Sequence, residues 1–245
     1  MTENDAVTAA VVVIGNEILS GRTRDENATY FLKELRTLGV DVRRVSVIPD
    51  EIQAIGDEIR SASRNFDYVF SSGGVGPTHD DVTIQGVAAA FERKVGPSSE
   101  LESTLREYYQ DNLTDAMLRM ADVPEGASLV RGDQMWFPVI VVENVYIFPG
   151  VPEILTSKFQ SIKERFREDP FFTRDVYLVV EEGHVADVLH EVLAKYPNLL
   201  LGSYPTFTNP EYRVKLTLES KSEDYLNGAH GFLLRCLAAR SIDPI

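Results

Sequence analysis

Two adjacent carboxylates follow a glycine-rich segment in the first half of the chain. The glycines are Gly73, Gly74 and Gly76, and the carboxylates are Asp80 and Asp81. The segment follows an apolar run typical of a buried strand and precedes a run typical of a helix. Glycines let the backbone approach a phosphate closely, and the first amides of a helix bind anions. Two carboxylates would repel a phosphate unless a cation lay between them, so the segment predicts a divalent-metal and phosphate site.

Each feature of this segment also has a purely structural explanation. Glycine-rich turns between a strand and a helix are common, and Asp81 could simply cap the helix that follows. Asp80 could be an ordinary solvated acid. Thr78 and Thr83 could donate hydroxyl hydrogen bonds to phosphate oxygens or stabilise turns. His79 could donate to a phosphate, although an exposed turn histidine is the more common arrangement.

A second polar segment lies at the end of an earlier strand-like run. Its candidate ligand-binding residues are Gly15, Asn16, Glu17, Arg22, Arg24, Asp25 and Asn27. The segment follows the apolar run 9–13 and leads into a helix expected at 28–38. In an open parallel sheet, the ligand crevice lies outside the carboxyl ends of the strands, so both segments can face one crevice. Arg22 and Arg24 could clamp a diphosphate or remain solvated loop charges.

Three blocks of the sequence, taken in order, carry a resemblance to a known family. Blocks 15–27 and 73–83 resemble the MoaB/Mog-type molybdopterin-binding domain, and 148–153, of sequence FPGVPE, resembles its CinA branch. The stretch 201–205, followed by 212–218, is similar to the amino-terminal part of eukaryotic FAD synthases. The resemblance implies an α/β fold: a three-layer domain with a mostly parallel sheet, followed by a small α+β module.

The resemblance also implies roles for individual residues. Asp81 matches the family's acid that is implicated in catalysis or metal binding, and Asp80 matches the second acid of the CinA pattern. Asn16 stands where an aspartate is often found, which removes one possible metal charge. The implied catalytic residues are Asp80 and Asp81, and the implied metal ligands are Glu17, Asp25 and Asp81. The implied substrate-binding residues are Gly15, Asn16, Gly73, Gly74, Gly76, Thr78, Thr83, Arg22 and Asn27.

The activity implied by the resemblance is hydrolysis of a nucleotide diphosphate linkage, in FAD, ADP-ribose or a related dinucleotide. The implied cofactor is a divalent metal, Mg²⁺, Mn²⁺ or Co²⁺, which would neutralise the diphosphate and acidify a water. Two alternatives stay open: a non-catalytic module that binds molybdopterin or a nucleotide, and adenylyl transfer in molybdenum cofactor biosynthesis. The 245 residues include neither the nucleotidyl-transferring domain of full FAD synthases nor the CinA-type deamidase domain.

Composition limits the partners. The formal net charge is −14 and the isoelectric point about 4.7, which argues against nonspecific nucleic-acid binding. No apolar run is long enough to predict a membrane-spanning helix. A single cysteine, Cys236, and a polar, acidic start lead us to expect a cytoplasmic protein. We expect a small nucleotide or pterin ligand, no nucleic acid, no membrane and a homo-oligomer.

Alternating strand and helix patterns predict a parallel sheet in a first domain, 1–168. Its expected strands are 40–48, 67–72, 128–130, 139–142 and 145–148. Its expected helices are 51–64, capped by Asp50, then 84–91, 98–120 and 153–167. A boundary at 168–170 precedes a β-α-β-β-α module, 169–245, with elements expected at 175–181, 185–196, 199–204, 212–219 and 223–240. The histidines of this module show no zinc-binding spacing, and Arg213 and Lys215 are expected to be structural or peripheral.

Overall fold

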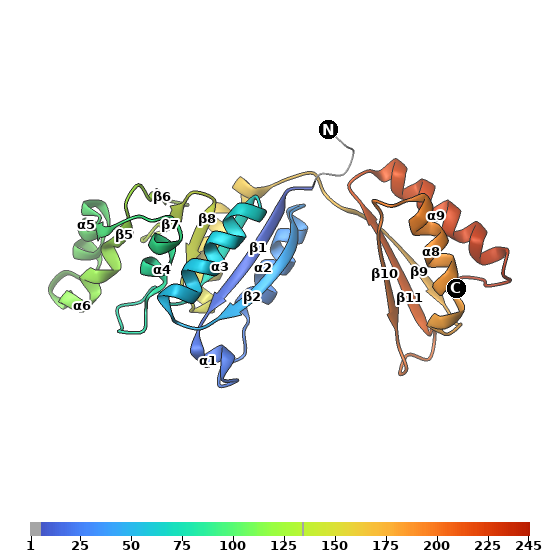
Figure 1. Ribbon diagram of the computed structural model, residues 1–245, viewed down its shortest axis with the longest axis horizontal. Helices are drawn as coiled ribbons and strands as arrows, with labels where there is room; N and C mark the ends of the chain where they lie inside the picture. The colour runs from blue at the N-terminus through green and yellow to red at the C-terminus, as the bar shows by residue number, and fades with distance from the viewer. Residues whose placement is uncertain (1–5, 134) are drawn as a thin grey trace. The chain divides into compact units, whose positions relative to one another are not determined.

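The computed structural model describes residues 6–133 and 135–245. The chain forms two compact units, of which one is Val7–Glu168 and the other contains Asp169–Ile245. Figure 1 shows the helices and strands of the two units. Each unit buries its own hydrophobic core. The predicted fold class, an α/β domain with a mostly parallel sheet and a small α+β module, is confirmed.

A six-stranded sheet organises the first unit. The strand order is β2-β1-β3-β8-β7-β6. Strands β2, β1, β3 and β8 run parallel, whereas β7 runs antiparallel to both of its neighbours. The bounds are β1 (Thr8–Ile14), β2 (Asp41–Ile48), β3 (Tyr68–Ser72), β6 (Ser128–Val130), β7 (Val139–Val142) and β8 (Val145–Phe148).

Helices cover both faces of this sheet. The alternating side chains of β1 contact the helices on each face. The odd-numbered residues of 9–13 join a core cluster with α2 (Asn27–Thr37) and α7 (Pro152–Ile162). The even-numbered residues of 10–14 join a second cluster on the opposite face. The helices of that second cluster are α3 (Ile52–Asn65), α4 (Thr83–Ala90) and α5 (Ser99–Tyr109). A continuous apolar run is typical of a strand buried on both faces, and it explains the three layers.

The segment 98–120 is mostly helical, as predicted, but it does not form one continuous helix. The segment forms α5, η1 (Gln110–Asn112), α6 (Asp115–Leu118) and η2 (Arg119–Ala121). Gln110 has a φ of 48°, a left-handed conformation that ends α5, and the Thr114 side chain accepts a hydrogen bond from the Met117 N–H at the start of α6. The short antiparallel pair β4 (Val95–Pro97) and β5 (Asp122–Pro124) was not predicted.

The second unit has a three-stranded antiparallel sheet in the order β10-β11-β9. Its bounds are β9 (Phe172–Leu178), η4 (Glu182–His184), α8 (Ala186–Lys195), β10 (Leu200–Pro205), β11 (Val214–Ser220) and α9 (Glu223–Ala238). Alternate residues of β11, among them Leu216, pack with both long helices in one cluster. Cys236 lies in this cluster, and burial raises the pKa of its thiol. The strand expected at 175–181 begins three residues earlier.

Three shorter elements complete the fold: α1 (Asn16–Leu19) after β1, η3 (Lys163–Phe166) after α7, and the turn at Glu143 between β7 and β8. Over the residues that the structure describes, no helix is both long and apolar enough to span a bilayer.

Candidate functional site

A cavity of about 700 Å³ lies at the carboxyl ends of the parallel strands. The loop after β1 contributes Glu17 and Thr23, the loop after β3 contributes 73–76 and the acids that follow, and 149–152 comes from the end of β8. This is the edge at which open parallel sheets bind ligands, and the volume suits a small molecule. The structure therefore brings both polar loops and the third sequence block to one cavity.

Two glycines make room for two acids of the site. A Cβ at Gly15 would lie 2.6 Å from Glu17 Oε1, and a Cβ at Gly76 would lie 2.7 Å from Asp81 Oδ2. Real Cβ atoms do not approach oxygens so closely, so any larger residue would displace the carboxylate. Each glycine thus leaves free the space that a carboxylate a few residues further along the chain occupies.

Gly73 fits the glycine segment against the neighbouring strands. Its φ is +108°, and a Cβ there would lie 2.1 Å from the Ile14 carbonyl oxygen at the end of β1. Its N–H donates to the Phe148 carbonyl at the end of β8 (3.1 Å). Only glycine combines this conformation with so close an approach. The segment is therefore fixed to the strand on either side of β3.

Asp81 does not cap α4. The residue at the cap position is Val82, and the helix has no side-chain cap. Instead, Asp81 Oδ2 accepts hydrogen bonds from the Thr78 N–H (2.8 Å) and the Thr78 hydroxyl (2.6 Å). The structure therefore contradicts the capping alternative and gives Asp81 a place in the turn that lines the cavity.

Asp80 shares the Thr78 hydroxyl with Asp81. Thr78 Oγ1 lies 2.6 Å from Asp80 Oδ1 as well as from Asp81 Oδ2. One hydroxyl proton can serve only one carboxylate at a time, so two negative groups converge on a single donor. The hydrogen bond from the Thr78 hydroxyl stabilises the ionised form of Asp80. It therefore lowers the pKa of this carboxyl group.

Two predicted ligand-binding residues hold the loops together instead of lining the cavity. Thr83 is fully buried, and its hydroxyl donates to the Gly73 carbonyl (2.8 Å). Asn27 is buried, and its Nδ2 donates to Ser72 Oγ (2.8 Å) and to the Gly150 carbonyl (2.8 Å). Asn27 thus joins the first sequence block, 15–27, to the end of β3 and to the third sequence block, 148–153.

The rest of the first loop lies outside the cavity lining. Asp25 accepts hydrogen bonds from the backbone N–H groups of Asn27 and Ala28, the first two residues of α2 (both 3.1 Å). Arg22 and Arg24 are exposed. Of the predicted site residues, those that line the cavity are Glu17, Gly73, Gly74, Gly76, Thr78, Asp80 and Asp81. Those outside its lining are Gly15, Asn16, Arg22, Asp25, Asn27 and Thr83.

Asp50 lines the cavity, although a helix-capping role was predicted for it. The prediction that it caps the helix after β2 is wrong, because α3 has Glu51 at its cap position and no side-chain cap. Asp50 Oδ2 accepts a hydrogen bond from the Asn16 N–H (2.8 Å), and the residue lines the cavity. Its position two residues after the end of a parallel strand was the signal in the sequence.

The cationic side chains among the described lining residues are Arg119 and Lys158. Arg119 Nη2 donates to the Pro77 carbonyl (2.8 Å), so it supports the segment that carries both aspartates. Lys158 reaches the cavity from α7. Burial, aided by the charge of Arg131, lowers the pKa of Lys158 to about 7. Neither residue was predicted, because each lies in a helical segment whose sequence carries no ligand-binding motif.

Comparison with known proteins identifies the family. Residues 10–168 match the family described as "Probable molybdopterin binding domain". The chain belongs to this family. Residues 170–245 match "FAD synthase, middle domain". The predicted resemblance to the MoaB/Mog family, its CinA branch and FAD synthases is therefore confirmed.

Three relatives each cover about two thirds of this chain or more. A protein of Archaeoglobus fulgidus is 37% identical over 80% of this chain and 84% of its own length. A "Probable FAD synthase" of Caenorhabditis briggsae is 34% identical over 89% of this chain but only 47% of its own length. The chain thus spans about half of that relative. The crystal structure of CinA from Thermoplasma acidophilum is 32% identical, covers 66% of this chain and 98% of its own, and superposes with a TM-score of 0.60.

A divalent metal fits part of the acidic group. Carboxylate and hydroxyl oxygens are the ligands that Mg²⁺ and Mn²⁺ prefer, and Asp80 and Asp81 converge on the Thr78 hydroxyl. Over the described residues, no three histidine, cysteine, aspartate or glutamate side chains converge as a metal-binding group. Mg²⁺ commonly uses one or two carboxylates together with waters and substrate phosphates. The residues therefore fit a metal that arrives with a phosphate ligand, and do not form a complete protein cage.

Proposed function

We propose that this protein hydrolyses the diphosphate linkage of a nucleotide, with FAD, ADP-ribose or a related dinucleotide as substrate and a divalent metal as cofactor. The observation that carries the proposal is the turn 78–81. It presents two carboxylates around one hydroxyl, next to a glycine segment, on the wall of a cavity of about 700 Å³. The match of residues 170–245 to "FAD synthase, middle domain" supports a flavin or adenine nucleotide as the ligand.

The chain supplies distinct groups for the phosphate and the metal. The backbone of 73–76 lines the cavity and offers a surface on which phosphate oxygens can lie close to the main chain. Asp80 and Asp81 would hold the metal, which when bound supplies charge neutralisation and a more acidic water. Arg119, fixed by the Pro77 carbonyl, adds a positive charge to the same wall and would stabilise the charge on phosphorus oxygens.

The test is a turnover assay on purified protein. FAD, ADP-ribose and ATP are each incubated with Mg²⁺, Mn²⁺ or Co²⁺, and AMP is measured by chromatography. We expect metal-dependent release of AMP from FAD or ADP-ribose. Asp111→Asn, a change of an exposed acid in η1, should retain this activity. Absence of AMP in every combination, with protein that still binds the nucleotide, would overturn the proposal.

A non-catalytic binding module is the second candidate. One observation favours it: the described acids form no group of three metal-ligating side chains. Such a module would bind a nucleotide or pterin with no AMP released and with little dependence on metal. Calorimetric titration beside the turnover assay separates the two functions.

A further inference from the structure

Part of the cavity wall is aromatic. Tyr109, Trp136 and Phe137 line the cavity together with the apolar residues Met120 and Ile154. Trp136 is 40% exposed although its side chain is one of the largest apolar groups available. The cavity therefore combines an acidic, glycine-rich wall that suits phosphate and metal with an aromatic wall that suits a flat ring.

The exposed tryptophan is backed by a second ring. Trp136 stacks on Tyr108 with ring centroids 3.9 Å apart and an interplanar angle of 14°. Tyr109 meets both rings edge-on, at 5.0 Å from Tyr108 and 6.0 Å from Trp136. These contacts tie the Trp136 ring to the end of α5 and limit its rotation. A rigid aromatic surface loses little conformational entropy when a ligand binds.

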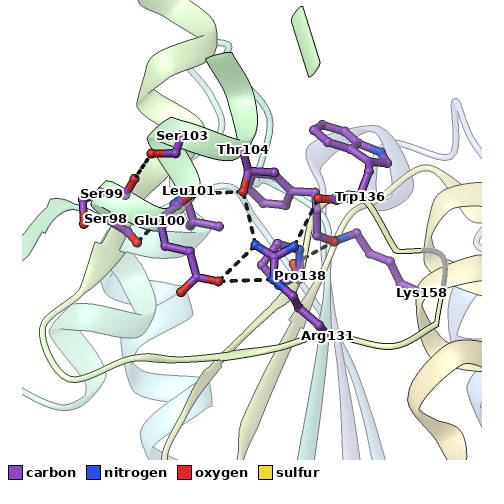
Figure 2. Close-up of polar contacts among 11 residues, drawn as sticks. Ser98, Ser99, Glu100, Leu101, Ser103, Thr104, Arg131, Trp136, Pro138 and Lys158 are labelled. Carbon is purple, nitrogen blue, oxygen red and sulfur yellow. Dashed lines mark hydrogen bonds and ion pairs between the residues drawn. The ribbon is translucent and has the colours of Figure 1, made fainter. Parts of the chain in front are cut away.

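Two basic side chains hold the backbone of the segment that carries this ring by its carbonyl groups. Arg131 Nη1 donates to the Trp136 carbonyl (3.4 Å), and Lys158 Nζ donates to the carbonyls of Phe137 (2.5 Å) and Pro138 (2.9 Å). Figure 2 shows the Arg131 guanidinium between the Glu100 carboxylate and the Trp136 carbonyl. Three successive carbonyls are thus anchored by two side chains from different parts of the fold.

Arg131 and Lys158 connect this segment to two different helices. Arg131 also donates to Glu100 Oε1 (3.0 Å) and Thr104 Oγ1 (3.2 Å), both on α5, whereas Lys158 belongs to α7. The segment that carries the tryptophan is therefore fixed between helices that cover opposite faces of the sheet. Burying Lys158 opposes its protonation and lowers its pKa to about 7, so its two carbonyl contacts come with a desolvation penalty.

From this arrangement we infer that the Trp136 ring is the stacking platform for the planar heteroaromatic ring of the ligand. The inference rests on the proposed function and narrows its substrate class: the cavity takes a nucleotide whose phosphates lie at 73–81 and whose ring lies on Trp136. Stacking of a base on an aromatic side chain tolerates different rings, because every base presents a flat face. Adenine and isoalloxazine rings both satisfy this requirement.

The chain provides a direct probe of this contact. Trp136 is its single tryptophan, so intrinsic tryptophan fluorescence reports on this ring alone. We expect ADP-ribose to quench it immediately on mixing with Mg²⁺, before turnover proceeds. Inorganic pyrophosphate and ribose 5-phosphate, which carry no aromatic ring, should bind without comparable quenching. Equal quenching by pyrophosphate, or none by ADP-ribose at saturation in calorimetry, would overturn the platform.

Variants test the energetic role. Trp136→Leu should weaken ADP-ribose binding by about tenfold in calorimetric titration with EDTA, where no metal-dependent turnover occurs. Its affinity for pyrophosphate should stay unchanged, and Trp136→Phe, which keeps a ring, should bind ADP-ribose nearly as the parent protein does. Phe207→Leu, a change of an 89% exposed ring in the other unit, is the matched control. An unchanged affinity of Trp136→Leu for ADP-ribose, or an equal loss for both ligands, would contradict the inference.

The same measurements distinguish failure of the platform from failure of the proposed hydrolysis. Ring-dependent quenching without AMP release would support the platform and reject the hydrolase. AMP release with no effect of Trp136→Leu on binding would support the hydrolase and reject the platform. Parallel titrations with FMN, which lacks adenine, and with ADP-ribose, which lacks flavin, identify the ring that occupies Trp136.

Discussion

Asn27 and Gly150, 123 positions apart in the sequence, are joined by a hydrogen bond of 2.8 Å from Asn27 Nδ2 to the Gly150 carbonyl. The same amide nitrogen donates to Ser72 Oγ. A substrate-binding role was predicted for Asn27, but its side chain is buried where the ends of β3 and β8 meet. It positions two loops that line the cavity, whatever ligand they bind.

Asn27→Asp should therefore destabilise the protein. The carboxylate keeps the size of the amide but cannot donate to the Gly150 carbonyl, so a buried acceptor loses its partner. We expect a loss of about 2–4 kcal/mol in the free energy of unfolding, measured by urea denaturation. Asn112→Asp, at an exposed position of η1, should change it by less than about 0.5 kcal/mol. Equal stability of the two variants would show that the Asn27 contacts contribute little.

Asp81→Asn separates charge from structure. The amide oxygen can still accept from Thr78, so the melting temperature should change little. If Asp81 holds the metal, AMP release should fall by about 100-fold or more, in the range seen when a key electrostatic group is lost. Asp111→Asn removes an exposed charge elsewhere and should keep full activity. Parental turnover by Asp81→Asn at saturating metal would remove this carboxylate from the mechanism.

Gly76→Ala tests how the glycine positions this acid. The new Cβ would lie 2.7 Å from Asp81 Oδ2, so the carboxylate must move. We expect activity to fall by about tenfold or more with a smaller effect on folding, because a displacement near 1 Å impairs catalysis strongly. Gly96→Ala is the control, since its Cβ would meet no atom within 4 Å. Similar activity in both variants would show that Asp81 tolerates displacement.

The sequence was sufficient to predict the sheet and the edge at which the loops meet. Apolar runs that end in glycine-rich loops indicate parallel strands, and their carboxyl ends share one edge by topology. The individual roles were not predictable in the same way. A polar residue such as Asn27 or Thr83 looks the same in sequence whether it faces a ligand or a carbonyl of the next loop. Only the buried hydrogen bonds distinguish these cases.

The aromatic wall could not be predicted for a different reason. Trp136 lies in the irregular segment before β7, which has no periodicity from which a direction can be inferred. Lys158 occupies a helix position that would normally be solvated, and the carbonyls it contacts are about 20 residues away in sequence. Long-range contacts to irregular backbone leave no local pattern. The helix break at Gln110, which requires a left-handed residue, was missed because glutamine is rarely found in that conformation.

Chelation should abolish activity without destabilising the fold. No three described acids, histidines or cysteines form a metal-binding group, so we expect folding to proceed without bound metal. With EDTA, AMP release should stop, and it should return on addition of Mg²⁺, Mn²⁺ or Co²⁺. The melting temperature should stay within about 1 °C in the absence of nucleotide. A large drop in melting temperature would indicate a structural metal and contradict this account.

Lys158 should make stability depend on pH. Its pKa is about 7 in the folded protein, below the ordinary value of 10.5, so the folded state binds fewer protons between these values. The stability of the parent protein relative to Lys158→Met should therefore rise as the pH increases from about 7 to about 10. We expect a rise on the order of 1 kcal/mol, which is discounted for solvent screening because the side chain is only partly enclosed. Below about pH 7 the lysine is protonated in both states and the difference should level off.

Urea denaturation of both proteins across this pH range measures the effect, and Lys33→Met, at an exposed position of α2, should show no such trend. A difference that is flat or falls with pH would mean that Lys158 stays charged, with its contacts to the Phe137 and Pro138 carbonyls outweighing its burial.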